Sequence, residues 1–482
     1  MKIAFRKRSN PPLAVTLCLL LSGCATFAEL QPSDVKVANV WHATLPHGGN
    51  ASSLLSWWST FNDPSLTALI GYAQEENPSL ASATAEIDKA RATLASARSS
   101  LFPGLDGSAS VTRSGTDGDA ANRITASTAS SGGLDASWEI DLFGKTRQTS
   151  EAARVRVDKQ IANWHDARVS LAAEVADYYV QYKACRQLEN VYSVELASQR
   201  ETIRATETAA TSGFTSTADL ALARASAASS SSTLTAQKAE CEVLVKSLAE
   251  VTGGDEARVR QLLAKGKAGI PAPKTFKPAA VPAEALRQRP DIGALELELA
   301  ASIADVGAAK ADLYPSLSLG CSVTVSSSTL TGGSLPWSFG PALTIPLLDG
   351  GSRRAAVRSA IADYDTAVAN YKSGVLSAVS EVEIALVRVD STRRRIGDAS
   401  SAARNYRSYF TSIDSNWRAG GASLLDREEA RRSAQSAEIS LIEIRRDAVR
   451  YWIALYKALG GGWNADAVTP AQRQTKSQGN SL

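Results

Sequence analysis

The chain carries one segment twice, and this repetition limits its possible folds more than any other feature. Residues 77–111 align without gaps to residues 289–323, and nine of these 35 positions are identical. Since a repeated sequence indicates a repeated structural unit, we expect two units in tandem. The predicted parts are a first unit over 61–254, a connector over 255–283, a second unit over 284–462 and a C-terminal tail over 463–482.

Each unit contains a very long stretch that favours a single helix. Residues 145–212 hold neither Pro nor Gly, and residues 352–419 hold no Pro and two glycines, Gly374 and Gly397. A helix of about 68 residues would be roughly 100 Å long, and apolar residues recur along it at spacings of three and four, as in packed helices. Glycine follows each stretch, which predicts a reversal of the chain. We therefore expect helical hairpins over about 145–250 and 352–459, with tips at Gly213 and Gly420.

Four short segments alternate between apolar and polar residues, a pattern typical of strands with two unlike faces. Each has about ten residues, the length of a tilted strand that crosses a bilayer, and aromatic residues lie near the ends, as in an interfacial girdle. A soluble sheet with one buried face shows the same alternation, so the pattern alone leaves both possibilities open. The predicted strands are 104–113, 133–142, 316–326 and 337–348, and the aromatic residues are Phe102, Trp138, Tyr314 and Trp337.

Four strands are too few to close a membrane barrel, and an open edge in lipid leaves backbone groups unpaired. If the strands span a membrane, several copies of the chain must share one barrel. Two copies would supply eight strands and three would supply twelve, and the alternation does not choose between them.

The first 23 residues have the pattern of an export signal. Four basic residues precede an apolar run that is too short to span a bilayer, and small residues stand directly before Cys24. This arrangement resembles the lipobox of bacterial lipoproteins, in which the cysteine is acylated. The prediction is a signal peptide over 1–23 and a lipidated segment over 24–60, and an ordinary signal peptide with an incidental cysteine is the alternative.

Charge and residue usage argue against several other classes of protein. Outside the first 24 residues, 52 − 4 = 48 basic residues face 49 acidic ones, so a nucleic-acid partner is not indicated. The three histidines, His42, His47 and His165, form no metal-ligand pair, and Gly460-Gly461-Gly462 lacks the strand–loop–helix context of a phosphate loop. We expect no enzyme, no metal and no cofactor.

Several motifs, in order along 24–470, resemble those of the outer-membrane factor family, the TolC-like efflux channels, and within it the NodT-type outer-membrane lipoproteins. They are Trp57-Trp58-Ser59-Thr60-Phe61-Asn62-Asp63-Pro64, Ile140-Asp141-Leu142-Phe143-Gly144-Lys145, Leu286-Arg287-Gln288-Arg289-Pro290-Asp291, Trp337-Ser338-Phe339-Gly340-Pro341 and Pro346-Leu347-Leu348-Asp349-Gly350-Gly351.

The resemblance implies a membrane α+β fold: a homotrimer with a 12-stranded transmembrane β-barrel, four strands per chain, that continues into a long α-helical periplasmic barrel. It implies a lipid-anchored channel in the bacterial outer membrane. The expected partners are a periplasmic adaptor (membrane fusion) protein and an inner-membrane pump of RND, MFS or ABC type. The expected function is passive efflux of small amphiphilic compounds or drugs, as in multidrug resistance. The alternatives are an exit duct for proteins or peptides and a structural periplasmic coiled-coil lipoprotein.

The resemblance also places candidate functional residues at the two hairpin tips. Acidic residues close the periplasmic gate in this family, and the spacing of Gly420, Asp426 and Glu429 matches its pattern, with Asp219 at the first tip. The alternative is that these acids are merely solvated residues at helix starts. The predicted adaptor contacts are Gly213, Phe214, Trp417, Gly420 and Leu424.

Two further predictions concern the cysteines and the charge of the strand faces. Cys185 lies 28 residues before Gly213 and Cys241 lies 28 after it, so an antiparallel hairpin would place the two cysteines side by side, as a disulfide or as two buried thiols. The polar faces of the first strand pair carry acids and no base, which predicts a cation-preferring barrel lumen. These acids are Asp106, Asp135, Glu139 and Asp141.

Overall fold

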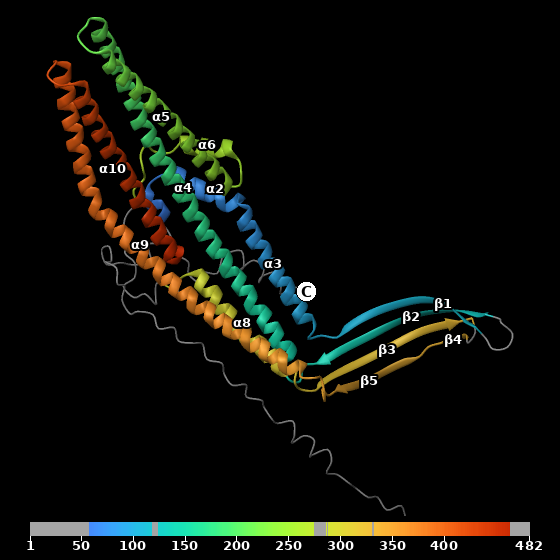
Figure 1. Ribbon diagram of the computed structural model, residues 1–482. Coiled ribbons are helices and arrows are strands. Elements are labelled where there is room, and N and C mark those ends of the chain that lie inside the picture. The colour runs from blue at the N-terminus through green and yellow to red at the C-terminus, as the bar shows by residue number, and fades with distance from the viewer. Residues whose placement is uncertain (1–56, 118–123, 274–285, 287, 330–331, 463–482) are drawn as a thin grey trace, which may run out of the picture.

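The molecule is elongated, with a sheet at one end and two helical tips at the other (Figure 1). The computed structural model describes residues 57–117, 124–273, 286, 288–329 and 332–462. The predicted signal peptide, Cys24, most of the segment 24–60 and the tail 463–482 lie outside the described residues.

Two long helical hairpins form most of the molecule. The first pairs α4 (Lys145–Thr211) with α5 (Thr217–Val251), and the second pairs α9 (Ser352–Arg418) with α10 (Leu424–Ala458). The long helices have 67 residues each, because neither Pro nor a strained turn interrupts them. Gly374 lies within α9 at a close approach of α8, where an added Cβ would clash with Leu295.

Shorter helices pack beside the middle of the hairpins and along the half nearer to the sheet (Figure 1). They are η2 (Trp57–Phe61), α2 (Pro64–Glu76), α3 (Pro78–Ser99), α6 (Glu256–Ala264), α8 (Pro290–Ala311) and η3 (Gly460–Gly462). The main apolar core lies here, where the ring of Trp57 stacks on Tyr456 at 4.7 Å and both pack with Tyr179 and Leu386. The core therefore joins the start of the described chain to α4, α9 and α10.

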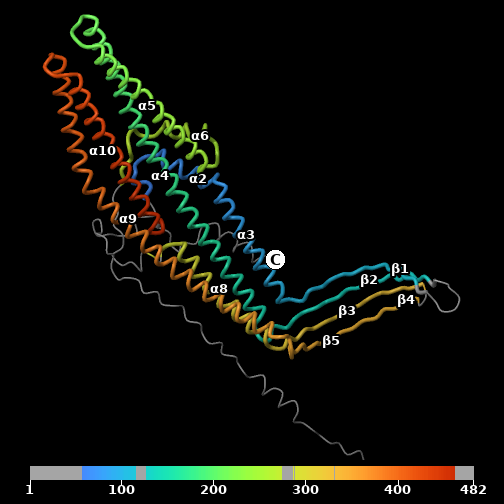
Figure 2. Tube along the Cα trace, viewed as in Figure 1, coloured from blue at the N-terminus to red at the C-terminus, as the bar shows by residue number. Residues whose placement is uncertain are grey.

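The strands form one antiparallel sheet that extends away from the helices (Figure 2). Their order is β1 (Gly104–Asp117), β2 (Ile124–Ile140), β3 (Ser316–Ser328) and then β5 (Trp337–Thr344), with the short β4 (Gly332–Ser334) pairing with the far end of β3. The pairing of β2 with β3 joins the strands of the first half of the chain to those of the second.

The strand ends differ from the sequence-based expectation. The strand expected at 104–113 continues to Asp117, and the strand expected at 133–142 spans Ile124–Ile140, because β1 and β2 stay paired into the segment that joins them. The predicted segment 337–348 is a strand only as far as Thr344, because Pro346 has no N–H to continue the ladder. In the other direction the pairing extends beyond Pro336 into β4. Within β5, Pro341 is tolerated because the strand lies at an edge of the sheet.

The two faces of the sheet differ in character. One face carries apolar side chains that are largely exposed, among them Leu105, Val111, Trp337 and Phe339, with exposed fractions of 66–75%. The opposite face carries serines, threonines and acids, and serines pair across strands, as in Ser110 with Ser131 and Ser322 with Ser338. Soluble monomeric proteins rarely expose an apolar face of this kind to water. Among the described helices, none combines the length and apolar character that a membrane crossing requires.

Candidate functional site: the hairpin tips and the polar layer beneath them

Both hairpin tips use the same backbone device to reverse the chain. Gly213 has φ +78° and Gly420 has φ +80°, a left-handed conformation that glycine adopts without strain. Past each glycine the next N–H returns to the helix: Phe214 donates to the Ala209 carbonyl at 2.8 Å and Gly421 to the Asn416 carbonyl at 2.9 Å. The tips lie next to each other at the end farthest from the sheet (Figure 1).

The predicted gate acids Asp219 and Asp426 bind the start of their own helices. Asp219 forms a capping box with Ser216, and Asp426 forms one with Ser423. Hydrogen bonds from the Ser216 hydroxyl, then the Thr215 hydroxyl and the Ser216 N–H, lower the pKa of Asp219. The Ser423 hydroxyl and N–H likewise lower the pKa of Asp426. Both side chains are therefore ionised at neutral pH and oriented by the tip.

Glu429 is exposed and takes no part in a capping box. It lines a groove of about 620 Å³ between α9 and α10, together with Tyr406, Arg432 and a set of small residues. Its carboxylate is thus available to solvent in one copy of the chain.

The predicted adaptor contacts differ in exposure. Phe214 is 87% exposed at the first tip, whereas Leu424 is buried. Trp417 is half-buried, because the guanidinium of Arg427 lies 4.6 Å from the centre of its ring. Of the apolar tip residues, Phe214 is the one that a single copy presents most fully to a partner.

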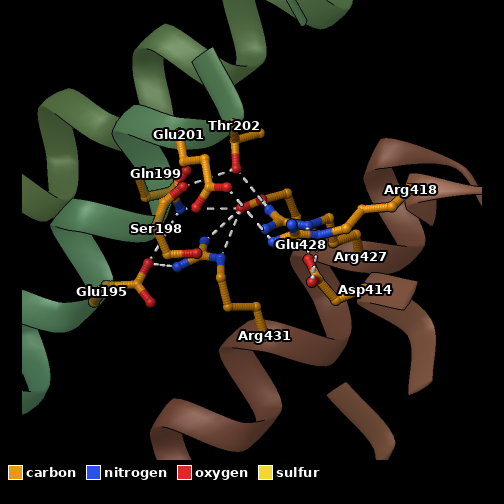
Figure 3. Close-up of polar contacts among 10 residues, drawn as sticks. All are labelled: Glu195, Ser198, Gln199, Glu201, Thr202, Asp414, Arg418, Arg427, Glu428 and Arg431. Carbon is orange, nitrogen blue, oxygen red and sulfur yellow. Dashed lines mark hydrogen bonds and ion pairs between the residues drawn. The ribbon is translucent and has the colours of Figure 1, made fainter. Parts of the chain in front are cut away.

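Beneath the tips, buried polar side chains join the two hairpins (Figure 3). We call this group the inter-hairpin layer, and sequence analysis did not identify it. Six of its seven members are between 1% and 7% exposed. The members are Glu195, Gln199 and Thr202 from α4, Asp414 from α9, and Arg427, Glu428 and Arg431 from α10.

Glu428 lies at the centre of the inter-hairpin layer. Its carboxylate accepts hydrogen bonds from Gln199 Nε2 at 3.0 Å, Arg431 Nε at 3.2 Å and Arg427 Nη1 at 3.3 Å. Arg431 also pairs with Glu195 across the helices. Burial, with a smaller effect of Arg432, lowers the pKa of Arg431 to about 10, so this guanidinium is still a cation at neutral pH. The two hairpins are therefore linked by buried charges close to the tips.

Arg427 contacts both hairpins from the side of the second tip. Its Nη1 donates to Thr202 Oγ1 at 2.6 Å, and its Nε donates to Asp414 Oδ1 at 2.5 Å. The guanidinium also lies over Trp417 and, at 5.8 Å, over Phe410. Planar guanidinium groups favour this combination of forked hydrogen bonds and ring contacts.

The predicted lumen acids fall into two groups. Asp106 lies directly opposite Asp135 in the register of β1 and β2, and Glu139 projects on the same face of β2. Asp141 lies beyond the end of β2. Its carboxylate accepts hydrogen bonds from the N–H groups of Thr146 at 3.2 Å and Arg147 at 2.9 Å, so it caps the start of α4 instead of extending the strand.

Cys185 and Cys241 form a disulfide between α4 and α5, with the Cα atoms 5.6 Å apart. Of the two possibilities that the spacing left open, the structure has the bridge. Cys321 is a free, exposed cysteine on β3. Cys24, the predicted lipid attachment site, lies outside the described residues.

A two-faced antiparallel sheet continued by two helices of about 100 Å, each paired with a shorter one, defines the class: a channel protein that reaches from a membrane into the adjoining compartment. The model of the family described as "Outer membrane efflux protein" matches residues 69–254 and 281–461. The chain belongs to the outer membrane efflux protein family, whose characterised neighbours are channels and not enzymes.

Similar proteins support the same assignment over nearly the full length. Nodulation protein T of Rhizobium leguminosarum bv. trifolii is 30% identical over 454 residues, which cover 92% of this chain and 96% of that protein. The solvent efflux pump outer membrane protein SrpC of Pseudomonas putida is 29% identical, covering 92% of this chain and 97% of that protein. The solved structure of the outer-membrane channel OprN is 29% identical, with a TM-score of 0.79, and covers 89% of this chain and 98% of that chain.

Proposed function

We propose that the chain is the outer-membrane channel of a tripartite efflux system and conducts small amphiphilic compounds without chemistry of its own. The observation that carries the proposal is the continuity between an exposed apolar sheet face and two long helical hairpins. The sheet would stand in lipid and the helices would form a tunnel beyond it. The name of the relative SrpC, a solvent efflux pump component, supports small apolar or amphiphilic cargo.

A homotrimer is the proposed assembly. The sheet of one chain has open edges at β1 and β5, and an open edge in lipid leaves several backbone groups unpaired. Three copies of the four main strands would close one 12-stranded barrel, as the family resemblance implies. Two copies would close eight strands, and the size of the assembly distinguishes these cases.

An internal duplication is part of the proposal. Its support is the equal length of corresponding elements: α3 and α8 have 22 residues each, α4 and α9 have 67, and α5 and α10 have 35. Together with the aligned segments of sequence, this equality favours one structural unit used twice.

The proposed partners are a periplasmic adaptor protein and an inner-membrane pump of RND, MFS or ABC type. The tips would meet the adaptor, with Phe214 and the residues around Gly213, Trp417, Gly420 and Leu424 as contacts. Asp426, Glu429 and Asp219 would form the periplasmic gate in the trimer, where copies of each acid come close together. Their support is the position of all three at the tips and the exposure of Glu429.

A lipid anchor at Cys24 completes the proposed localisation. The support is the sequence before this cysteine, where a charged start and a short apolar run precede small residues. One acyl-modified terminus would anchor the chain while the sheet spans the membrane.

Deleting the gene and measuring susceptibility to dyes, detergents and antibiotics tests the proposed function. Loss of an efflux channel should lower the tolerated concentration of several amphiphilic compounds, and the wild-type gene should restore it. Unchanged susceptibility together with an accumulation of secreted protein or peptide in the periplasm would favour the export duct. Recovery of a Cys24→Ala chain in the soluble fraction without detergent would favour the structural lipoprotein.

A further inference from the structure

The inter-hairpin layer differs from the contacts that join the hairpins farther from the tips. There, α4 packs on α10 largely through apolar side chains, as in the cluster of Ala184, Leu188 and Ile442, and the ion pair of Arg450 with Asp177 is partly exposed. Nearer to the tips, the contacts between these helices that the structure describes run through Glu195, Gln199 and the arginines of α10. Directed, charged contacts fix orientation more strictly than apolar contacts do.

Arg427 is the member of the layer that connects it to the second tip. It follows Asp426 directly in the chain, yet its side chain points inward and is 2% exposed while that of Asp426 is exposed. It reaches Thr202 on the first hairpin, and Asp414 and Trp417 near the end of α9. Between Trp417 and Asp426 there are only eight residues, so this single side chain holds both ends of the tip loop.

The structure assigns Arg427 as a positioning residue that sets the second tip against the first hairpin and thereby orients Asp426 and Glu429. This inference rests on the proposed function, in which those acids form the gate. The assignment is more specific than a requirement for positive charge. A lysine would keep the charge but could not reach Thr202 and Asp414 together while lying flat over the Trp417 ring.

The other contacts of the tip loop are exposed. Arg418 pairs with Glu201 of the first hairpin, and Asn416 donates to the Gly421 carbonyl at 3.2 Å. Gly420 and Gly421 form the reversal, and the groove just below, between α9 and α10, is lined largely by alanines and serines. The Ser423–Asp426 capping box orders the start of α10 but does not reach the first hairpin. Loss of the Arg427 contacts should therefore free the second tip without unfolding the hairpin.

A spin label on the tip tests this assignment directly. Cys321 would be replaced by Ser to remove the exposed thiol, and Ala422 would be replaced by Cys and labelled with a nitroxide in the full-length, detergent-solubilised assembly. In the Arg427→Lys variant we expect the spectrum to lose its immobilised component. A label at Ser212 of the first tip should be unaffected, which separates a local effect from general loosening. Arg393→Lys is the matched control, because Arg393 is an exposed arginine of α9 that pairs with Asp390.

Thr202→Val provides a milder variant in case Arg427→Lys does not assemble. It removes the acceptor on the first hairpin with little change in shape, and it should mobilise the Ala422 label in the same direction. An immobilised label in both variants would overturn the assignment.

Single-channel recording on the same preparations separates this inference from the proposed function. A channel whose conductance rises in Arg427→Lys and stays unchanged in Arg393→Lys supports both. If neither the wild type nor the variants conduct, but the label is mobilised in Arg427→Lys, the proposed channel is refuted and the positioning role of Arg427 stands. Unaltered conductance with a mobilised label would refute the link from Arg427 to the gate.

Discussion

Buried charge beside the tips has a direct consequence for stability at the scale of single residues. Glu428 faces two arginines and an amide in a site from which water is largely excluded. Replacement by Gln would leave Arg427 and Arg431 without their shared carboxylate, and breaking a buried pair costs about 3–5 kcal/mol. We expect Glu428→Gln to lower the midpoint of urea unfolding of the helical region, measured by circular dichroism.

The control for that variant is an exposed pair on the same hairpin. Asp390→Asn removes the partner of the exposed Arg393 and Arg394, and exposed ion pairs contribute about 0–1 kcal/mol each. Equal midpoints for Glu428→Gln and Asp390→Asn would mean that the inter-hairpin layer is hydrated and contributes little.

The acids of the two capping boxes give a prediction about pH. Hydrogen bonds lower the pKa of Asp219 and Asp426 in the folded chain. A lowered pKa means that these contacts stabilise the tips above the unfolded value of about 3.9 and are lost as the pH falls through the folded value. Conductance should therefore stay level between about pH 7.5 and pH 5.5 as far as these two acids control it. A titration centred near pH 6.5 would assign the control to another group.

At the scale of elements, the disulfide distinguishes the first hairpin from the second. Cys185 and Cys241 are 56 residues apart in the chain and bridge α4 to α5, and bridges over loops of this kind stabilise by about 2–4 kcal/mol. The Cys185→Ser, Cys241→Ser double variant should lose roughly that much stability in the first hairpin. Alkylation before and after reduction, followed by mass measurement, should find two further reactive thiols only after reduction. Labelling of both without reduction would show that the bridge is absent in solution.

A second prediction at the scale of elements concerns the glycines at the tips. Gly420 adopts φ +80° with open space around the position of a Cβ, so Gly420→Ala meets backbone strain and no steric clash. The left-handed conformation costs an L-residue about 1–2 kcal/mol. Gly397→Ala in α9 is the matched control, since this helical glycine also has open space but no positive φ. It should stabilise the helix by about 1 kcal/mol. Protease cleavage near the tip should increase in Gly420→Ala alone.

Local sequence signals account for the elements but not for the contacts between them. The absence of Pro from 145–212 and the alternation in 104–113 are visible in the chain itself, and the structure has α4 and β1 there. The alternation does not predict that β2 begins at Ile124 or that β5 ends at Thr344, although Pro346 indicates the second of these. The inter-hairpin layer was missed for a different reason: Gln199 and Glu428 lie 229 residues apart, and nothing local tells which acid of Glu428-Glu429 turns inward. Arg427 and Arg431, one helical turn apart, were the available hint.

At the scale of the whole molecule, the polar face of the sheet predicts ion preference. Asp106 and Asp135 face one another on that face, and three copies would multiply the negative charge inside one barrel. In planar bilayers under a salt gradient, we expect the reversal potential of a cation-selective channel. In the double variant Asp106→Asn, Asp135→Asn, the reversal potential should shift toward zero. Replacing Asp141 should have a smaller effect, because its carboxylate caps α4. An anion-selective wild-type channel would contradict this prediction.

The two unpaired margins of the sheet have a consequence for biogenesis. A single copy has unpaired backbone groups on β1 and β5, which can pair with a strand of another chain. It also has an exposed apolar face. Pro341 removes one backbone N–H from the edge of β5, but the other backbone groups of that strand can still pair with another chain. In the proposed trimer, a newly made subunit would therefore be prone to aggregation until it assembles, and its recovery would depend on the rate of assembly or on a protein that covers the open edges meanwhile.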